Sequence, residues 1–365
     1  MYSSPYLNWC SKVKIAIIGI VGLPASYGGF ETLVENLVEA PEMEATVYCS
    51  GTHYQYRPAK IKRTELVYLP INANGPISVL YDILSILHAL VSGHRRLLVL
   101  GTSGALILPM VRLFFPTVQI VINIDGVEWK RDKWNGFAKW FLKFSEALAV
   151  KYSSVVIADN AAIADYVKNY YHTGCETIAY GGDHAVVETD VMELRPDLAS
   201  HKDYAFSVCR IEPENNVELI LASFAHTKLE LVFVGNWQSS HYGKELLGLY
   251  SHYPNISLLD PIYELKILAA YRKGCWAYVH GHSAGGTNPS LVEMMHFDKP
   301  VVAFDCVYNR STMEDHGSFF STLEDLNEIM QSERVLPGGA ELGAVARRRY
   351  TWDVVREMYL GLFDR

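Results

Sequence analysis

The sequence lacks several features that would assign its chemistry at once. Its six cysteines are far apart and form no CxxC pair, which argues against a disulfide framework or a zinc site and favours a reducing compartment. No GxGxxG or GxxxxGK pattern occurs, so the dinucleotide and Walker phosphate-binding fingerprints are absent. The formal net charge of -8 argues against extended wrapping of a nucleic acid.

Long uninterrupted hydrophobic runs are also missing. Glycine, proline and arginine interrupt the apolar stretch 97–124, which favours a strand, a helix and a second strand over a transmembrane helix. Residues 12–23 imitate the basic and apolar regions of a signal peptide, but they also fit a buried first strand that leads into a glycine-rich turn. We favour the strand.

What the sequence does contain is a regular alternation of two kinds of segment, short runs of Val, Ile and Leu and longer amphipathic stretches. This alternation predicts an α/β fold in which crossover helices join parallel strands. The predicted strands are Val13–Ile20, Ala45–Cys49, Leu66–Leu69, Leu97–Leu100, Val118–Ile122, Val155–Ala158, Thr177–Ala179, Tyr204–Cys209, Leu229–Val234, Ile256–Leu259, Ala277–His280 and Val301–Phe304. The predicted helices are Phe30–Glu39, Ile77–Val91, Ala105–Phe115, Ala161–Tyr170, Val217–Phe224, Leu246–Tyr250, Leu265–Tyr271 and Pro289–Phe297.

A chain of 365 residues is long enough for two domains. The alternation becomes irregular after residue 181, so we predict an N-terminal Rossmann-like domain over 1–182 and a linker over 183–202. A second doubly wound, Rossmann-like domain is predicted over 203–349. Ligands of such folds bind beyond the C-terminal ends of the strands, so we expect the site in the cleft between the domains.

Two glycine-rich loops are candidates for binding an anion. Gly28 and Gly29 follow the first strand and open a helix, where free N–H groups and the helix dipole favour negative charge, although a tight turn alone explains them equally well. In the second loop, Gly285, Gly286 and Thr287 precede Asn288, which fits the N-cap of a helix that starts at a proline.

Three further kinds of residue near these loops can bind a ligand or a metal. Glu293 lies one turn into the second helix, where it could accept a hydrogen bond from a sugar hydroxyl or simply be a solvated helix residue. His280 and His282 have no nearby acidic or cysteine partner, so we expect no metal site. Arg210 follows a strand and could clamp a phosphate, or form a surface ion pair with a nearby glutamate.

With these motifs the chain resembles the family 4 glycosyltransferases of the GT-B fold, most closely the bacterial rhamnosyltransferase-type branch that builds capsular and cell-wall polysaccharides. The matching segments span nearly the whole chain: Gly22–Glu31, Asn123–Arg131, Arg210–Val217, Gly235–Trp237 with Tyr242 and Gly243, Gly286–Glu293 and Tyr350–Asp353. The resemblance implies two Rossmann-like domains facing a cleft, a nucleotide-sugar donor on the C-terminal domain and an acceptor on the N-terminal one. It further implies retention of anomeric configuration, no metal and no cofactor. It also implies that the helix in 350–365 returns to the N-terminal domain.

The resemblance also implies roles for individual residues. Arg210 would hold the donor diphosphate, Glu293 would bind the nucleoside sugar, and the loop before and into the second helix would line the phosphates and the hexose. The implied donor-binding set is Gly28, Gly29, Arg210, Asn215, His282, Gly286, Thr287, Asn288, Ser290, Leu291 and Glu293. Two positions depart from the family, which has a lysine at Asn215 and a glutamate at Gly285, so Lys244 and His282 are candidates to replace them.

Asp125 is the candidate catalytic residue. It follows the strand Val118–Ile122 and precedes a glycine, which places a carboxylate at the C-terminal end of a strand. By resemblance it lies near the reacting sugar and the acceptor, where it would act as a general base on an acceptor hydroxyl. Two alternatives stay open: Asp125 caps the following segment, or the leaving phosphate takes the proton in a same-face attack.

The segment 129–152 carries six basic and two acidic residues, so its net charge is +4 in an acidic chain. We predict a membrane or acceptor surface at Trp129, Lys130, Arg131, Lys133 and Trp134, which would suit an acceptor carried on a polyprenyl diphosphate. The apolar stripe that follows, Phe137, Trp140, Phe141, Phe144 and Leu148, fits core packing better than a membrane face.

Together these features predict a retaining glycosyltransferase that moves a deoxyhexose, L-rhamnose from dTDP-β-L-rhamnose, to a lipid-linked saccharide. It would be cytoplasmic and peripheral at the inner face of the cell membrane. The alternatives are a UDP- or GDP-hexose donor, a non-hydrolysing nucleotide-sugar 2-epimerase, and a saccharide-binding pseudoenzyme.

Overall fold

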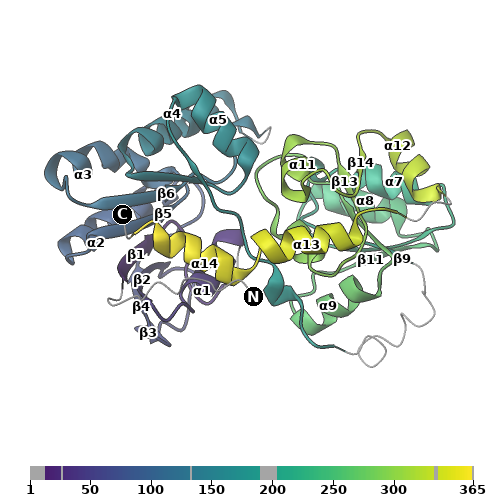
Figure 1. Cartoon of the computed structure of the whole chain (residues 1–365), viewed down its shortest axis with the longest axis horizontal. Helices are drawn as coiled ribbons and strands as arrows, with labels where there is room; N and C mark the ends of the chain where they lie inside the picture. The colour runs from purple at the N-terminus through teal and green to yellow at the C-terminus, as the bar shows by residue number, and fades with distance from the viewer. Residues whose placement is uncertain (1–12, 26–27, 132–133, 190–203, 333–335, 364–365) are drawn as a thin grey trace, which may run out of the picture. The chain divides into compact units, whose positions relative to one another are not determined.

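In the computed structural model the chain divides into two compact units (Figure 1). The structure describes residues 13–25, 28–131, 134–189, 204–332 and 336–363. The first unit comprises Met1–Asp159, Ile163–Ile178 and Val355–Arg365, and the second comprises Asn160–Ala162 and Ala179–Val354. Neither unit is therefore a single stretch of the chain.

An eight-stranded sheet forms the centre of the first unit, within the part of the chain that the structure describes. Its strands are β1 (Val13–Ile18), β2 (Met43–Ser50), β3 (Lys60–Ile61), β4 (Thr64–Leu69), β5 (Arg96–Leu100), β6 (Gln119–Asn123), β7 (Val155–Ala158) and β8 (Glu176–Thr177). The order across the sheet is β3-β4-β2-β1-β5-β6-β7-β8, and only the β3–β4 pair is antiparallel. β1 is buried at five of its six positions, as expected for a parallel strand covered on both faces.

Helices connect these strands and cover the sheet. They are α1 (Gly29–Leu37), α2 (Ser78–Val91), α3 (Leu108–Phe114), α4 (Gly136–Tyr152), α5 (Ala161–Tyr171) and the C-terminal part of α14 (Trp352–Gly361), with short 3-10 turns η1 (Ser103–Ile107) and η2 (Glu128–Lys130). The end of α14 is fixed within this unit, because the Tyr359 hydroxyl lies 3.1 Å from Asn123 Nδ2 and Arg356 Nε donates to the Asn36 carbonyl.

The second unit is built around a six-stranded parallel sheet, counting described residues only. Its strands are β9 (Tyr204–Val208), β10 (Glu230–Val234), β11 (Ile256–Leu259), β12 (Ala277–His280), β13 (Val301–Phe304) and β14 (Ser318–Phe320), in the order β11-β10-β9-β12-β13-β14. Its helices are α7 (Val217–Ala225), α8 (His241–Tyr250), α9 (Leu265–Gly274), α10 (Pro289–Met295), α11 (Val307–Met313), α12 (Leu323–Gln331) and α13 (Gly339–Arg349), with 3-10 turns η3 (Asp183–Ala185) and η5 (Pro213–Asn215). Two apolar clusters, one on each face of the sheet, form the core of this unit.

The strand order determines where each unit can hold a ligand. In the first unit the order reverses between β1 and β5, and in the second it reverses between β9 and β12. At such a switch point the loops that follow the two strands diverge to opposite faces and leave a crevice. The loops after β9 and β12 carry Arg210 and His282, so the sequence candidates of the second unit lie at its switch point.

The α/β prediction is confirmed, and β7, β11, β12 and β13 have the predicted bounds. Other elements differ at their ends. The strand predicted at Thr177–Ala179 is β8 at Glu176–Thr177, and α8 begins at His241 rather than Leu246 because the Ser240 side chain caps it by accepting from Gly243 N. The elements after Phe304, from α11 to α13, were not predicted.

A buried carboxyl group near the switch point of the first unit makes stability depend on pH. Asp82 lies on α2, accepts a hydrogen bond from Ser103 Oγ, and burial raises its pKa to about 7. A raised pKa means that the folded state binds the proton more tightly than the unfolded state does. The contribution to stability is therefore complete below the ordinary carboxyl pKa and is lost as the pH rises toward 7.

We expect the Asp82→Asn variant to lose this dependence. Between pH 5 and pH 8 the wild type should lose about 2 to 3 kcal/mol that the variant keeps, because each unit of pKa shift corresponds to about 1.4 kcal/mol. Thermal unfolding at both pH values measures the difference. The exposed Asp165→Asn on α5 is the control, and equal pH dependence of wild type and Asp82→Asn would contradict the assignment.

Candidate functional site

The loops that follow β9 and β12 lie beside each other because the two strands pair directly. The first loop runs from Cys209 through η5 to Asn216, and the second runs from Gly281 to Asn288. A Cβ atom at Gly281 would overlap the Asn215 carbonyl group, so the backbones of the two loops are in direct contact. Ser283 adds two hydrogen bonds to the Glu214 carbonyl, through its N–H at 3.0 Å and its hydroxyl at 2.8 Å.

Asn215, at the position where the resembling family has a lysine, connects the two loops. Its side chain is almost fully buried, and its Nδ2 donates to the Arg210 carbonyl at 2.7 Å. Its Oδ1 lies 2.8 Å from His282 Nδ1. Both polar atoms of the amide are therefore engaged within the protein. Asn215 fixes the two loops in position and has no charge with which to bind a phosphate.

His282 is positioned by this contact. Because Asn215 Oδ1 can only accept, His282 Nδ1 is the donor of this hydrogen bond. Nε2 faces Gly285, which has a φ of +109°, so the glutamate that the family has at this position would be strained here.

Arg210 lies in the first of the two loops and extends into solvent. Its side chain is 67% exposed, and NH1 lies 3.6 Å from Glu212 Oε1. The ion pair that the sequence suggested is therefore present, but an exposed pair of this length contributes little to stability. The guanidinium remains accessible to an anion, while its main chain is fixed by Asn215.

The segment Gly286–Leu291 is organised around Asn288, which caps α10 as predicted. Its Oδ1 accepts from the Ser290 N–H at 3.0 Å, and its carbonyl accepts from the Leu291 N–H at 3.1 Å. These two amides are thus engaged inside the turn. The Thr287 hydroxyl lies 3.3 Å from Asn160 Nδ2, a buried contact that sequence reasoning did not find.

Glu293 is the most strongly constrained of the predicted residues. One carboxylate oxygen pairs with the buried Arg272 of α9, and the other lies 3.4 Å from His184 Nε2. His184 Nδ1 in turn accepts from Trp352 Nε1 at 2.9 Å. Burial alone raises the pKa of Glu293, but the Arg272 charge and the hydrogen bond from His184 outweigh it, so the pKa lies below its ordinary value.

The carboxylate of Glu293 is therefore ionised and still has lone pairs available, so it can accept from a hydroxyl group. Arg272 and His184 were missed by the sequence analysis. A regular helix such as α9 gives no local signal that one of its arginines points inward, and the spacing of 21 residues between Arg272 and Glu293 reflects tertiary packing alone.

In the first unit, Asp125 follows β6 and has a φ of +61°. Its N–H donates to Asn123 Oδ1 at 3.0 Å, and Asn123 Nδ2 donates to Tyr359 of α14. The N-cap of the following 3-10 turn, η2, is Val127, which makes no side-chain cap bond. A left-handed backbone conformation is uncommon outside glycine and is often found at functional sites. The conformation of Asp125 at the C-terminal end of a parallel strand is therefore consistent with a functional role.

Gly28 and Gly29 form the start of α1, as predicted, with Gly28 as its N-cap in an extended conformation. The loop before them is fixed by Glu31, whose buried Oε1 accepts from the Val21 N–H at 2.9 Å. Sequence reasoning did not single out Glu31. The two glycines and Asp125 belong to the first unit, and the other predicted donor-binding residues belong to the second.

The residues predicted to form a membrane surface are largely engaged with one another. Glu128 accepts from Trp134 Nε1 at 3.1 Å and pairs with Arg131 at 3.2 Å. The half-buried Trp129 ring lies beneath the ammonium groups of Lys143 and Lys130, at 4.7 and 5.7 Å from its centroid. Lys133 lies outside the described residues. In the described part of this segment Lys130 is exposed and Arg131 is half-buried, so the described residues do not form a continuous basic patch.

The aromatic stripe on α4 differs from its prediction. Core packing was predicted for it, but Phe137, Trp140 and Phe144 are exposed. The reason is the neighbouring residues: Ser145, Glu146, Ala149 and Val150 form the buried side of α4, with Glu146 accepting from two tyrosine hydroxyls. A buried glutamate with two tyrosine partners lies on the inner side of α4 in place of the aromatic stripe, and an amphipathic pattern alone does not predict this.

The described residues contain no group of three or more His, Cys, Asp and Glu side chains placed to hold a metal ion. His280 is buried and its Nε2 has no hydrogen-bond partner, and burial together with the nearby His282 lowers its pKa well below the ordinary value. The described helices also include none with the length and hydrophobicity needed to cross a bilayer.

Comparison with known proteins gives two family matches. Residues 192–328 match the model described as "Glycosyl transferases group 1", and residues 12–183 match a domain of unknown function, DUF1972. The first match contains all of the candidate residues between Arg210 and Glu293. No curated protein matches the sequence.

Solved structures resemble the chain over almost its whole length. Sucrose-phosphate synthase from Thermosynechococcus elongatus is 15% identical with a TM-score of 0.78, and the alignment covers 96% of this chain and 98% of that one. The fold is GT-B. A second GT-B relative, the Anabaena protein Alr3699/HepE in complex with UDP, is 13% identical over 97% and 99% of the two chains, with a TM-score of 0.71. Trehalose 6-phosphate synthase from Burkholderia multivorans is 11% identical over 97% and 96%, with a TM-score of 0.73.

Proposed function

We propose that the protein is a retaining glycosyltransferase that moves a deoxyhexose, L-rhamnose from dTDP-β-L-rhamnose, to a lipid-linked saccharide of a capsule or cell-wall polysaccharide. It would act in the cytoplasm, peripherally bound to the inner face of the cell membrane. The observation that carries the transferase assignment is the pair of loops at the switch point of the second unit, inside the segment that matches the glycosyl transferases group 1 model.

Within this proposal each candidate residue has a chemical task. Arg210 supplies the cation for the donor diphosphate, and Glu293 accepts from hydroxyl groups of the nucleoside sugar. His282, held by Asn215, is assigned to the donor site beside them. Gly286, Thr287 and Asn288 are assigned to line the phosphates and the hexose, and Gly28 and Gly29 are assigned to the same phosphates. Asp125 is the general base for the acceptor hydroxyl.

A UDP-hexose donor is the second candidate. Similar structures contain UDP, UDP with glucose and UDP-glucose, all in the Anabaena protein Alr3699/HepE. At 13 to 14% identity this similarity supports the same fold, but it does not show that the residues that bind the base and the sugar are the same.

One experiment separates these possibilities. The purified chain is incubated with dTDP-rhamnose, UDP-glucose and a GDP-hexose in turn, each with membrane-extracted lipid-linked acceptors, and the products are identified by mass spectrometry. A deoxyhexose added to the acceptor supports the proposal, and an added hexose supports the second candidate. Conversion of a nucleotide sugar without an acceptor would identify a 2-epimerase, and binding without turnover a pseudoenzyme.

Donor affinity should depend on Arg210. Hydrogen bonds to charged groups contribute about 1.5 to 3 kcal/mol, so we expect the Arg210→Ala variant to bind the nucleotide sugar ten- to hundredfold more weakly. Titration calorimetry measures the change. Lys266→Ala, an exposed cation on α9 of the same unit, is the matched control. Unchanged affinity in Arg210→Ala would remove this residue from the donor site.

A further inference from the structure

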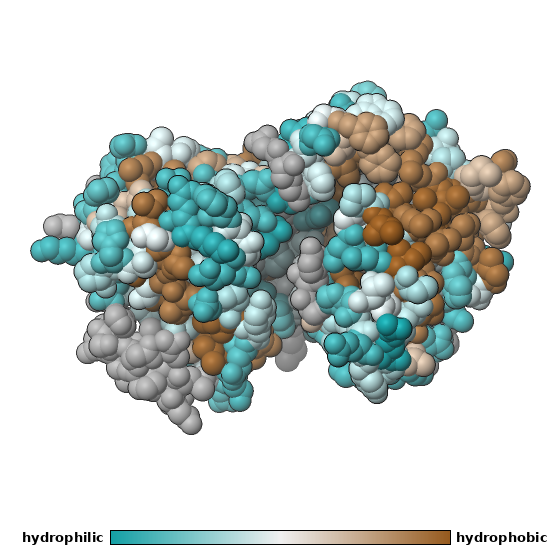
Figure 2. Space-filling view, turned by 180° about the vertical axis from the view of Figure 1, so that it is seen from behind, coloured by the Kyte–Doolittle hydropathy of each residue, from teal (hydrophilic) through white to brown (hydrophobic). Residues whose placement is uncertain are grey.

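The outward side of helices α2, α3 and α4 is covered by large apolar side chains. η1 packs against α2 and α4, and α3 packs against α4, so the three helices form one layer on the first unit. Of the 19 large apolar side chains that are exposed among the described residues, 11 lie on this layer. They are Ile77, Leu80, Leu84, Leu87, Val91, Met110, Leu113, Phe114, Phe137, Trp140 and Phe144, called here the apolar face. Figure 2 shows a broad hydrophobic area on the lobe that carries these helices, at the right in that view.

Helix α2 is apolar on both of its sides. Leu80, Leu84, Leu87 and Val91 are spaced by three or four residues and point outward, while Tyr81, Ile86 and Leu90 are buried. No exposed Asp, Glu, Lys or Arg lies on α2. A helix with this pattern is stable when a second apolar environment covers its outer side, and an apolar patch that extends over three helices marks an interaction surface.

The exposed charges on the three helices that carry the apolar face have one sign. The three helices contain two acidic residues, Asp82 and Glu146, and both are buried. Their basic residues are Arg112 on α3 and three lysines on α4. In a chain with a net charge of -8, a layer with no exposed acidic side chain is complementary to a negatively charged partner.

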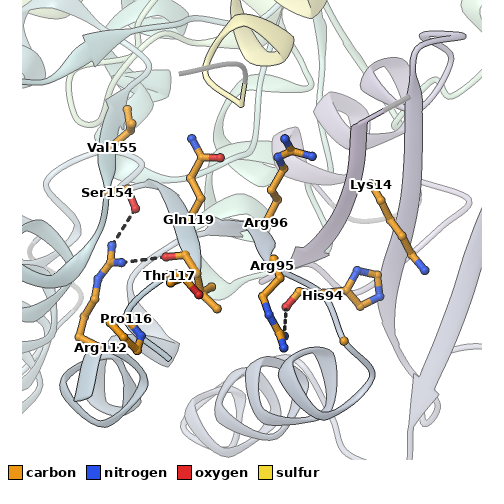
Figure 3. A pocket seen from close by; sticks show the side chains of 12 residues that line it. Lys14, His94, Arg95, Arg96, Arg112, Pro116, Thr117, Gln119, Ser154 and Val155 are labelled. Atoms are coloured by element: carbon orange, nitrogen blue, oxygen red, sulfur yellow. Dashed lines mark hydrogen bonds between the residues drawn. The ribbon is translucent and has the colours of Figure 1, made fainter. Parts of the chain in front are cut away.

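A basic pocket lies where the apolar face ends (Figure 3). The pocket has a volume of about 900 Å³ and is lined by Lys14, His94, Arg95, Arg96 and Arg112, with no Asp or Glu. Gly93, Pro116 and Ser154 also line it, and each comes two residues after the last residue of α2, α3 or α4. The pocket therefore opens at the C-terminal ends of the same three helices.

The cations of the pocket have no carboxylate partner among the described residues. Arg112 donates to the Tyr152 and Val118 carbonyls at 2.6 and 2.8 Å and to Ser154 Oγ, so neutral acceptors fix its guanidinium. Arg95 donates only to the adjacent His94 carbonyl. Arg95 is exposed, and Val91, Leu113 and Phe114 beside the pocket are 86%, 69% and 64% exposed.

We propose that the apolar face and the basic pocket together dock the protein on an anionic phospholipid bilayer. The apolar side chains enter the boundary between headgroups and acyl chains, and Arg95, Arg96 and Lys14 meet the lipid phosphates. A second copy of the chain is the poorer partner, since a two-fold interface would bring the same unpaired cations together. This inference rests on the membrane part of the proposed function and replaces the surface expected at Trp129–Trp134.

Sedimentation with vesicles of phosphatidylcholine, with and without added phosphatidylglycerol, tests the proposal on the full chain. We expect binding to the anionic vesicles that weakens at high salt. The Leu113→Gln/Phe114→Gln variant should bind at least tenfold more weakly. Arg95→Gln/Arg96→Gln should lose about fivefold per cation at low salt. Leu249→Gln/Tyr263→Gln in the second unit and Lys168→Gln on α5 are the matched controls, and both should bind as the wild type does.

The proposal is overturned if the wild type does not bind anionic vesicles. It is equally overturned if Leu113→Gln/Phe114→Gln and Arg95→Gln/Arg96→Gln bind as well as the controls. It is also overturned if sedimentation velocity shows a dimer that Leu113→Gln/Phe114→Gln dissociates while vesicles bind nothing. Sugar transfer to a water-soluble acceptor analogue, measured on the same preparations, tests the transferase function separately from the docking surface. Transfer without vesicle binding would reject the docking surface alone, and vesicle binding without transfer would reject the transferase alone.

Discussion

The Asp125→Asn variant is expected to lose at least a hundredfold in turnover while its donor affinity changes by no more than a few-fold. General base catalysis typically contributes 10² to 10⁴ in rate, and the amide keeps the shape of the side chain but cannot take a proton at neutral pH. The choice of asparagine matters because residue 125 has a φ of +61°. Asparagine tolerates the left-handed region, whereas alanine would add backbone strain to the loss of the carboxylate.

Steady-state kinetics with saturating donor, together with calorimetric donor titration, separates chemistry from binding. Asp165→Asn on α5, an exposed aspartate of the same unit, should leave both quantities unchanged. Normal turnover in the Asp125→Asn variant would assign proton removal to the leaving phosphate and leave Asp125 with a conformational role in the loop after β6.

The Arg272→Met variant should lose about 3 kcal/mol of stability in the second unit, because it leaves the partly buried Glu293 carboxylate without its strongest partner. His184 compensates in part, since its Nε2 lies 3.4 Å from the carboxylate. The loss should shrink as the pH falls below the ordinary carboxyl value of 4.5, because Glu293 then binds a proton in the variant. Chemical denaturation at neutral and acidic pH measures both effects.

A double variant makes this prediction specific to the pair. Arg272→Met/Glu293→Leu removes both charges, so it should recover most of the stability that the single variant loses. The same double variant should bind nucleotide sugar poorly if Glu293 contacts the donor. Full stability with normal donor affinity would show that the pair is structural only, and a double variant as unstable as Arg272→Met would show that the loss comes from packing.

Much of the fold was predictable because parallel strands carry a strong local signal. β12 is buried at all of its positions, and its apolar run appears directly in the sequence. The ends of elements were less predictable because caps determine them: Ser240 starts α8 five residues before the apolar pattern begins. The predicted activity, and the assignment of donor and acceptor to the two domains, came from the family resemblance, because strand patterns indicate a fold and not a reaction.

The roles of candidate residues could be predicted where a local loop or cap pattern indicates them. Contacts between residues far apart in the sequence could not be predicted. Asn288 was assigned as a cap from its place before a proline, and the structure confirms it. By contrast, the link from Asn215 to His282 and the pairing of Arg272 with Glu293 join residues 67 and 21 positions apart. The outward direction of the α4 stripe was missed for the same reason, because the buried side of the helix contains Glu146, which bonds to Tyr166 and Tyr171 of α5.

The assignment of Val355–Arg365 to the first unit has a practical consequence for protein engineering. A fragment that stops at residue 182 would lack the C-terminal residues of α14, including Tyr359, whose hydroxyl is the partner of Asn123 two residues before Asp125. A chimera that exchanges the second unit to obtain a new donor preference should therefore import 179–354 only. It should retain the native last eleven residues, so that the transplanted segment becomes an insertion rather than a fusion.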